Sequence, residues 1–275
     1  GHAFMVLGNH ELNALVDEPK DGSGWYFPCR AEKDGRQYAP WKMLPEADKP
    51  ALNAWLAEQP LVLANQDLRI VHAAWLPESL ATLEAAVGED LIAQYRRYDD
   101  ELVHALQTAS WYGDYLREQE KHAEALENAD MPPPPMPATA QYELARSRLH
   151  PIRALTSGAE VIAPAPFYAG GRWRYTARSA WWSDYRERVP VLVGHYWRHW
   201  YPRDADPTRE NLMPPQNNAW HGAAHNVFCI DYSVGARWRD RKAGIAPAHS
   251  EFRLAAMRWP ERVLVFDDGE TAATV

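Results

Sequence analysis

AFMVLGNHE, residues 3–11, is a short apolar run that ends abruptly in glycine, a carboxamide, an imidazole and a carboxylate. A plain turn needs Gly or Asn, but it does not need His and Glu beside them. A metal or phosphate site at the carboxyl end of a strand does need such groups. The pattern therefore predicts a strand over residues 3–8, a polar site at residues 9–11, and a helix that starts in the following "ELNALV".

Four further runs have the composition of strands. They are "LRIVHAAW" (68–75), "VPVLVGHYW" (189–197), "NVFCIDYSVG" (226–235) and "RVLVFDD" (262–268). Continuous apolar runs of this length suit strands that are buried on both faces of a layered α/β fold. Helices are expected between them, over residues 49–59 and, two or three in number, over residues 77–130. We interpret residues 1–275 as one α/β domain in which residues 76–184 form a helical, proline-rich cap insertion.

The composition excludes some classes of protein. With 46% hydrophobic residues and 13 Trp, the chain can form one large core or two smaller ones. A net charge of −8 disfavours general binding to nucleic acids or anionic membranes, and no apolar stretch has the length of a membrane span. Cys29 and Cys229 are too few for a disulfide framework, so we expect buried free thiols in a reducing, cytoplasmic setting.

Three histidines follow apolar runs in the same way. They are His10 in "VLGNHE", His72 in "IVHAA" and His195 in "LVGHYW". A lone histidine in such a place is usually structural, but three at separate strand ends weaken that interpretation. The carboxyl ends of strands in an open α/β sheet converge on one crevice, and imidazole and carboxamide oxygen both bind Mn²⁺, Fe or Zn²⁺.

"GNHE", "VHAA" and "GHYW", in this order, resemble the second half of the calcineurin-like metallophosphoesterase family. "CIDYSVGA" after them is similar to the strand that closes that fold, and the four pieces span residues 8–236. Within that family, the motifs are similar to those of bacterial members related to Ser/Thr phosphatases and dinucleoside tetraphosphatases. The resemblance implies a two-sheet sandwich flanked by helices.

The resemblance also implies residue roles. Asn9, His72 and His195 would be ligands of the second of two divalent ions, with Mn²⁺ expected first and Fe, Zn²⁺ or Ni²⁺ as alternatives. His10 would protonate the leaving oxygen as a general acid, and Glu11 would orient the turn or cap the helix. The implied activity is hydrolysis of phosphate mono- or diesters by a metal-activated water. The implied partner is a phosphorylated small molecule, nucleotide or phosphoprotein.

Two departures from the family pattern stand out. Many members have a second His two residues after "GH", where this sequence has Trp197. The phosphoprotein-phosphatase branch lacks that His too. His199 could substitute for it, although a surface or core role is the favoured interpretation of His199. The motifs "DxH" and "GDxxDRG", which precede "GNHE" in the family and supply carboxylate ligands, have no counterpart here. We therefore expect an N-terminally truncated phosphoesterase that is almost inactive as these 275 residues.

Arginines supply candidate substrate contacts. Arg198 could touch substrate or form a surface salt bridge. Arg172 and Arg174, in "RWRYTAR", could line a phosphate approach, although the period-2 pattern favours an edge strand with Trp173 and Tyr175 inward. If they bind a partner or phosphate, the chain could instead be a non-catalytic remnant.

Two further features keep alternatives open. Asp231 is either structural or the missing carboxylate of a different, mononuclear hydrolase. "HGAAHN" (221–226) has two histidines at helical spacing, but a solvated loop fits better because a strand follows at once.

Overall fold

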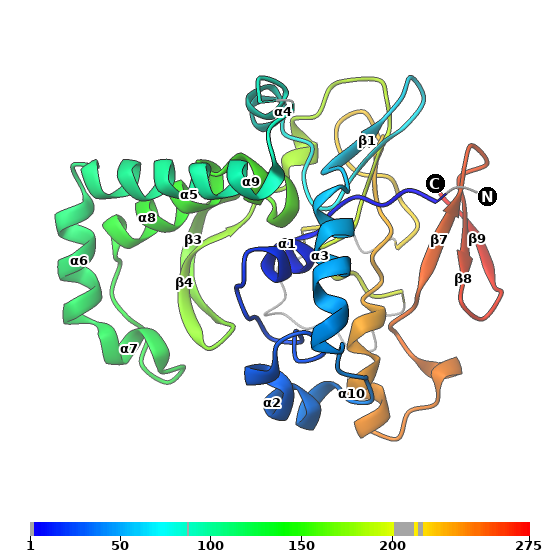
Figure 1. Cartoon of the computed structure of the whole chain (residues 1–275), viewed down its shortest axis with the longest axis horizontal. Helices are drawn as coiled ribbons and strands as arrows, with labels where there is room; N and C mark the ends of the chain where they lie inside the picture. Colours follow the sequence, from blue (N-terminus) through cyan, green and yellow to red (C-terminus); the bar gives the residue numbers. More distant parts are fainter. Residues whose placement is uncertain (1–2, 87, 201–211, 214–216) are drawn as a thin grey trace. The chain divides into compact units, whose positions relative to one another are not determined.

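The computed structural model describes residues 3–86, 88–200, 212–213 and 217–275, and it has a mixed α/β fold (Figure 1). The chain divides into two compact units. Unit 1 comprises Gly1–Ala73 and Trp182–Val275, and unit 2 comprises Ala74–Trp181. The limits of unit 2 lie within a few residues of the segment 76–184 that the sequence singles out.

The main sheet of unit 1 has the strand order β1-β2-β5-β6. Its strands are β1 (Val62–Ala64), β2 (Arg69–Val71), β5 (Val191–Val193) and β6 (Val227–Cys229). β2, β5 and β6 are parallel, and β1 is antiparallel to β2. All residues of β5 and β6 are buried, which explains why these strands are continuous apolar runs. Three of the predicted strands are thereby confirmed.

A second, antiparallel sheet in unit 1 has the order β7-β8-β9. Its strands are β7 (Ala255–Arg258), β8 (Val263–Phe266) and β9 (Thr271–Ala273), and β8 matches the predicted strand over residues 262–268. Side chains from both sheets form one hydrophobic cluster, whose buried members are Leu192, Trp200, Trp220, Phe228, Tyr232, Leu264 and Phe266. The two sheets of unit 1 therefore share a core.

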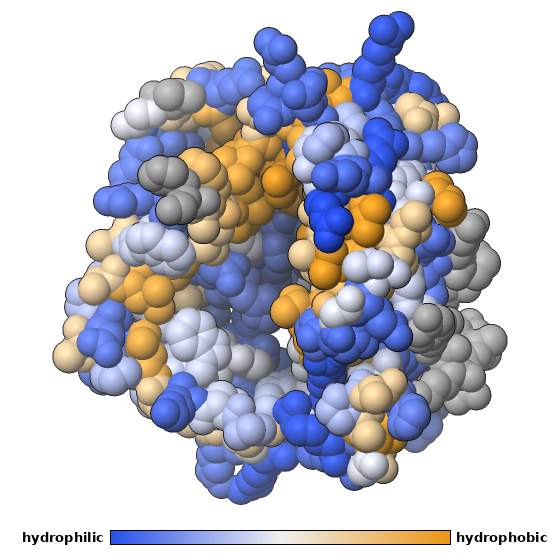
Figure 2. Space-filling view, turned by 90° about the vertical axis from the view of Figure 1, so that its right-hand side faces the viewer, coloured by the Kyte–Doolittle hydropathy of each residue, from blue (hydrophilic) through white to orange (hydrophobic). Residues whose placement is uncertain are grey.

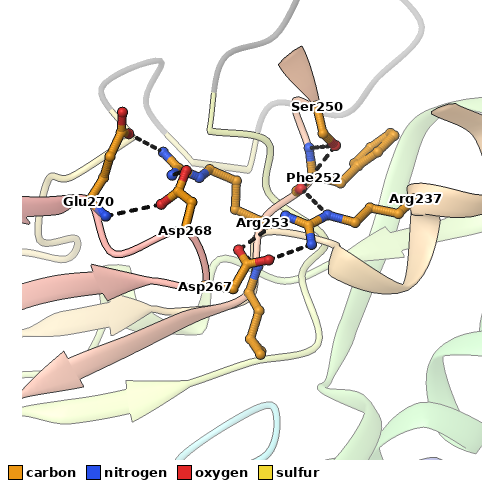
Figure 3. Close-up of polar contacts among 8 residues, drawn as sticks. Arg237, Ser250, Phe252, Arg253, Asp267, Asp268 and Glu270 are labelled. Carbon is orange, nitrogen blue, oxygen red and sulfur yellow. Dashed lines mark hydrogen bonds and ion pairs between the residues drawn. The ribbon is translucent and has the colours of Figure 1, made fainter. Parts of the chain in front are cut away.

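The turn between β8 and β9, residues 267–270, is an acidic turn that is bound by two arginines (Figure 3). Arg237 makes a bidentate ion pair with Asp267, in which one N···O distance is 3.0 Å. Arg253 reaches both Asp268 and Glu270, with 2.7 Å between Nη1 and the Glu270 carboxylate. Arg253 is only 5% exposed, so its ion pairs hold this hairpin against the loop before β7.

Helices complete unit 1. They are α1 (Asn9–Leu15), α2 (Pro28–Tyr38), α3 (Lys49–Ala57) and α10 (Arg237–Lys242), with 3₁₀ turns η1 (Glu46–Asp48), η3 (Val234–Ala236) and η4 (Pro247–His249). A further 3₁₀ turn, η2 (Trp181–Ser183), spans the sequence boundary between the two units. α3 confirms the helix predicted over residues 49–59, with Pro50 in its first turn.

The prediction of a strand over residues 3–8 is wrong. The segment is extended at Gly8, but it pairs with no strand of the described residues. Its amide at Leu7 donates to the carbonyl of Pro60 over 2.9 Å, and Phe4 is 78% exposed. An apolar run becomes a strand only when another strand lies beside it, and one backbone hydrogen bond does not make a ladder.

Unit 2 consists of helices and one hairpin. The helices are α4 (Pro77–Glu84), α5 (Leu91–Thr108), α6 (Tyr112–Lys121), α7 (Ala123–Glu127), α8 (Pro137–Arg148) and α9 (Pro151–Ser157). Residues 77–130 thus form four helices rather than two or three. The proline-rich residues 131–136 form an irregular loop, as predicted, and Pro137 opens α8.

The hairpin of unit 2 pairs β3 (Glu160–Ala169) with β4 (Arg172–Arg178). Gly170 and Gly171 form its two-residue turn, and both have positive φ, 61° and 80°. Glycine is favoured there because two-residue hairpin turns with this backbone strain other residues. The β4 strand confirms the edge-strand interpretation of "RWRYTAR".

The surface alternates between polar and apolar areas. On the face shown in Figure 2, hydrophobic residues gather in patches among hydrophilic ones. Large exposed apolar side chains of unit 1 include Phe4, Leu254 and Val275. Among the residues that the structure describes, no helix combines the length and apolar composition needed to cross a bilayer.

Candidate metal centre

Asn9 and His72 lie together in unit 1. Asn9 is the first residue of α1, and His72 follows the last residue of β2 directly. The Asn9 Oδ1 and His72 Nε2 atoms are 3.1 Å apart, which is hydrogen-bond distance. The sequence prediction that these two side chains converge thus agrees with the geometry, although the strand expected before Asn9 is absent.

His195 joins this pair from the neighbouring parallel strand. It lies two residues beyond β5, and its ring centroid is 5.4 Å from that of His72, at 67° between the planes. The Gly194 amide donates to the His72 carbonyl over 2.9 Å, which ties the two strand ends together. Asn9, His72 and His195 therefore form one strand-end cluster.

Gly8 allows this close approach. A Cβ atom at Gly8 would lie 2.7 Å from the His72 ring and 2.7 Å from the Glu11 carboxylate, so a larger residue would displace both. The Gly8 amide donates to Glu11 Oε2 over 2.9 Å, in a capping-box arrangement at the start of α1. Glu11 thus caps the helix, as expected, and the close contact accounts for the glycine.

The loop that carries His195 has an unusual backbone. His195 and Trp197 have φ of 68° and 54°, and Ser233 beside them has φ of 57°. Non-glycine residues adopt this region only where surrounding contacts hold them there. Here the Arg198 amide donates to the Asp231 carbonyl (2.9 Å), and Ser233 Oγ donates to the Arg198 carbonyl (2.8 Å).

The side chain of Asp231 belongs to the same support. Its Oδ1 accepts the Ser233 amide over 2.9 Å. That bond matches the structural interpretation of Asp231. Asp231 is nevertheless close enough for its charge to act on His72.

The electrostatic surroundings of His72 are mixed. Burial lowers its pKa, the carboxylates of Glu11 and Asp231 act in the opposite direction, and His10 lowers it further. A lowered pKa favours neutral imidazole, the form that binds metal. The two carboxylates supply negative charge near a ligand set that is itself neutral.

The donor spacing fits one divalent ion. Two atoms bonded at about 2.1 Å and at right angles lie about 3.0 Å apart, and two imidazoles on one ion have centroids roughly 4.5–5.5 Å apart. The observed 3.1 Å and 5.4 Å agree with both figures. Within the described residues, no three His, Cys, Asp or Glu side chains are placed to hold one ion, so a metal site here would need the Asn9 amide oxygen as its third donor.

His10 differs from its neighbour Asn9. It is exposed on the first turn of α1, whereas Asn9 is half-buried against His72. Its charge acts on His72, so it lies beside the cluster without being part of it. That position suits a group that exchanges protons with a bound substrate.

Arg198 requires a correction. It is only 7% exposed, its Nη1 donates to the Cys229 carbonyl over 3.1 Å, and its guanidinium stacks over the rings of Phe228 and Tyr232. A surface salt bridge does not fit a guanidinium that is buried in this way, whereas a substrate contact by Arg198 stays a prediction. His199 is also engaged elsewhere, because its Nδ1 lies 2.9 Å from Glu251 Oε2.

Arg172 and Arg174 belong to unit 2. Arg172 donates to the Gln119 side chain, and Arg174 Nε lies 3.5 Å from the Ala169 carbonyl. Trp173 donates to the Asn128 carbonyl over 2.8 Å, and Tyr175 is buried. These contacts hold the hairpin together and tie it to α6, and a phosphate contact by Arg172 or Arg174 stays a prediction.

The sequence did not single out the burial of His221. It lies in the loop predicted from "HGAAHN", but it is 3% exposed, and neither ring nitrogen has a hydrogen-bond partner. Burial lowers its pKa to about 4, and the charge of Arg198 acts in the same direction. Among the cysteines, Cys229 is buried as expected, but Cys29 is exposed.

Comparisons with family models, with curated proteins and with solved structures returned no match.

Proposed function

We propose that the strand-end cluster holds a divalent cation and that the protein is a phosphoesterase of the calcineurin-like kind. The observation that carries the proposal is the 3.1 Å approach of Asn9 Oδ1 to His72 Nε2, with His195 beside them. These are the positions at which the motif resemblance implies ligands. The shared core of the two sheets in unit 1 is compatible with the sandwich that the resemblance implies.

Each ligand would have a fixed role. Asn9 would present its amide oxygen from the start of α1, and His72 and His195 would present ring nitrogens from the ends of β2 and β5. A bound cation supplies Lewis acidity, which stabilises negative charge on phosphoryl oxygens. Gly8 keeps the His72 ring close to Asn9, and the hydrogen bonds around Arg198 hold the His195 loop.

His10 would be the proton donor to the leaving oxygen. It is exposed and adjacent to Asn9, and consecutive residues in the first turn of a helix point in different directions. One side chain can therefore face the cation while the next faces the substrate. General acids of this kind contribute on the order of 10²–10⁴-fold to the rate.

Metal binding tests the ligand assignment directly. Mn²⁺ titrations of the 275-residue chain, followed by electron paramagnetic resonance of the free ion, should give one site. His72→Ala and His195→Ala should each weaken binding by at least about 100-fold, because losing even a partner of a ligand costs about 10–100-fold. His225→Ala is the matched control, since His225 is exposed in a turn of the same unit. Unchanged Mn²⁺ affinity in His72→Ala would refute the site.

Turnover tests the role of His10 separately. In enzyme that hydrolyses phosphate esters, His10→Ala should keep its Mn²⁺ and lose kcat by about 10²–10⁴-fold. The loss should be smaller for p-nitrophenyl phosphate than for an alkyl phosphate, because p-nitrophenolate needs little protonation. If His10→Ala instead loses Mn²⁺ and keeps its rate per bound ion, His10 is a ligand and another residue is the acid.

A further inference from the structure

Unit 2 contains a pocket of about 550 Å³ that the proposed chemistry does not use. It lies between α6, the proline-rich loop and the start of α8. Its volume is typical of sites for small ligands. Trp111 and the prolines 134, 135 and 137 supply apolar wall, and Lys121 and His122 supply polar groups.

The acidic side chains of the pocket are already matched within the protein. Asp114 forms an ion pair with Arg117. Glu118 accepts hydrogen bonds from the Ala138 amide (3.2 Å), the Thr139 amide (2.7 Å) and Thr139 Oγ1 (2.8 Å). The Glu118 carboxylate therefore caps the first turn of α8, where the helix dipole offsets its charge.

The donors of the pocket are not matched in this way. Considering only the residues that the structure describes, the Lys121 ammonium, the Trp111 indole N–H and the His122 ring have no side-chain hydrogen bond or ion pair. Lys121 is exposed, and Trp111 and His122 are half-buried. The residues that line this cavity thus include one unmatched positive charge, two further polar groups and a proline-rich apolar wall.

We propose that this pocket binds an anionic small molecule with a planar ring, the class that nucleoside monophosphates represent. The anionic group would lie at Lys121 and His122, since an ammonium and an imidazole N–H can both donate hydrogen bonds to phosphate oxygens. The ring would pack against the Trp111 face and the prolines, which lose little conformational entropy on binding. The proposal rests on unit 2 alone and is independent of the phosphoesterase activity of unit 1.

Three ligands separate the contributions. Isothermal titration of the 275-residue chain in EDTA, which removes any cation from unit 1, should show AMP binding with a Kd on the order of 100 μM. Adenosine, which lacks the charge, and inorganic phosphate, which lacks the ring, should each bind at least about 10-fold more weakly. Equal affinity for AMP and either fragment would overturn the proposal, and so would an absence of AMP binding up to about 10 mM.

Variants locate the site. Lys121→Ala should weaken AMP at least about 10-fold and leave adenosine unchanged, because it removes only the charge contact. Trp111→Leu should weaken both AMP and adenosine. Arg146→Ala, an exposed cation on α8 away from the pocket, should bind AMP like the unaltered chain. Circular dichroism checks that each variant is folded, and AMP affinity unchanged in folded Lys121→Ala contradicts the proposal.

Discussion

The strand-end cluster and the acidic turn at residues 267–270 are two polar regions of unit 1 that are built on opposite principles. In the acidic turn, each carboxylate of the turn has an arginine partner (Figure 3). In the strand-end cluster, the side chains that meet are neutral donors, and the nearest carboxylates are turned to backbone amides. One region has its charges matched internally, whereas the other brings neutral side chains together with no matched charge.

The difference separates stability from function. Matched ion pairs with a buried arginine contribute to folding, because removing one partner leaves the other desolvated. Polar groups that meet without matched charge contribute little to folding and are typical of sites that bind something else. Substitutions should therefore unfold the protein in one region and disable it in the other.

The largest expected effect concerns His221, which belongs to neither of the two regions. Its buried ring nitrogens have no hydrogen-bond partner. Its pKa is about 4 in the folded protein against 6.5 when unperturbed, so the unfolded chain takes up the proton first. The contribution of His221 to the free energy of unfolding should be constant above pH 6.5. It should become less favourable as the pH falls towards 4, by about 3 kcal/mol in total.

His221→Phe should remove this loss. Urea unfolding of both chains across the pH range gives the difference directly. A His221→Phe chain whose stability falls as steeply with pH as that of the unaltered chain would show that His221 is solvated or partnered in solution.

Substitutions of Arg253 and His72, measured at one pH, compare the acidic turn with the strand-end cluster most directly. Arg253→Met should cost about 2–3 kcal/mol of unfolding free energy, because Arg253 pairs with two carboxylates and lies 4.1 Å over the Phe266 ring. Its partners are partly exposed, which limits the loss. His72→Leu should change stability by less than about 1 kcal/mol while abolishing Mn²⁺ binding. Equal destabilisation by the two substitutions would remove the distinction between the regions.

Asp267 gives the smallest effect. Its hydrogen bond and ion pair with Arg237 lower its pKa below 3.8, so its contribution is present at neutral pH and is lost as pH falls through that lowered value. Asp267→Asn should cost about 1 kcal/mol at pH 7, and the cost should shrink in acid. Denaturant unfolding at two pH values measures it, and a pH-independent cost would assign the effect to geometry instead of charge.

Much of the fold was predictable because burial leaves a direct pattern. β2, β5, β6 and β8 are apolar runs, and α3 has helical periodicity with proline in its first turn. β7 and β9 have mixed, half-exposed compositions, so nothing in their sequence distinguishes them from loop. The run at residues 3–8 looks like the buried strands, but pairing depends on a neighbour that a local pattern does not report.

The candidate site was predictable to the same degree. His72 and His195 could be expected to meet because parallel strands end at one edge of a sheet, and β2 and β5 are parallel neighbours. The contacts of Arg198 could not be predicted from the sequence, because only tertiary packing brings the Cys229 carbonyl and the two aromatic rings to its guanidinium. The burial of His221 likewise depends on contacts outside its own loop, including the Trp182 ring.

The parallel pairing of β2 with β5 has a consequence for how the chain folds. The whole of unit 2 lies between these strands in sequence, so pairing them from an unfolded chain closes a loop of about 120 residues. The helices and hairpin of unit 2 are local by comparison, and local contacts form faster than distant ones. We therefore expect unit 2 to be structured before the main sheet of unit 1. During synthesis, His195 would reach His72 only after the whole of unit 2 had been made.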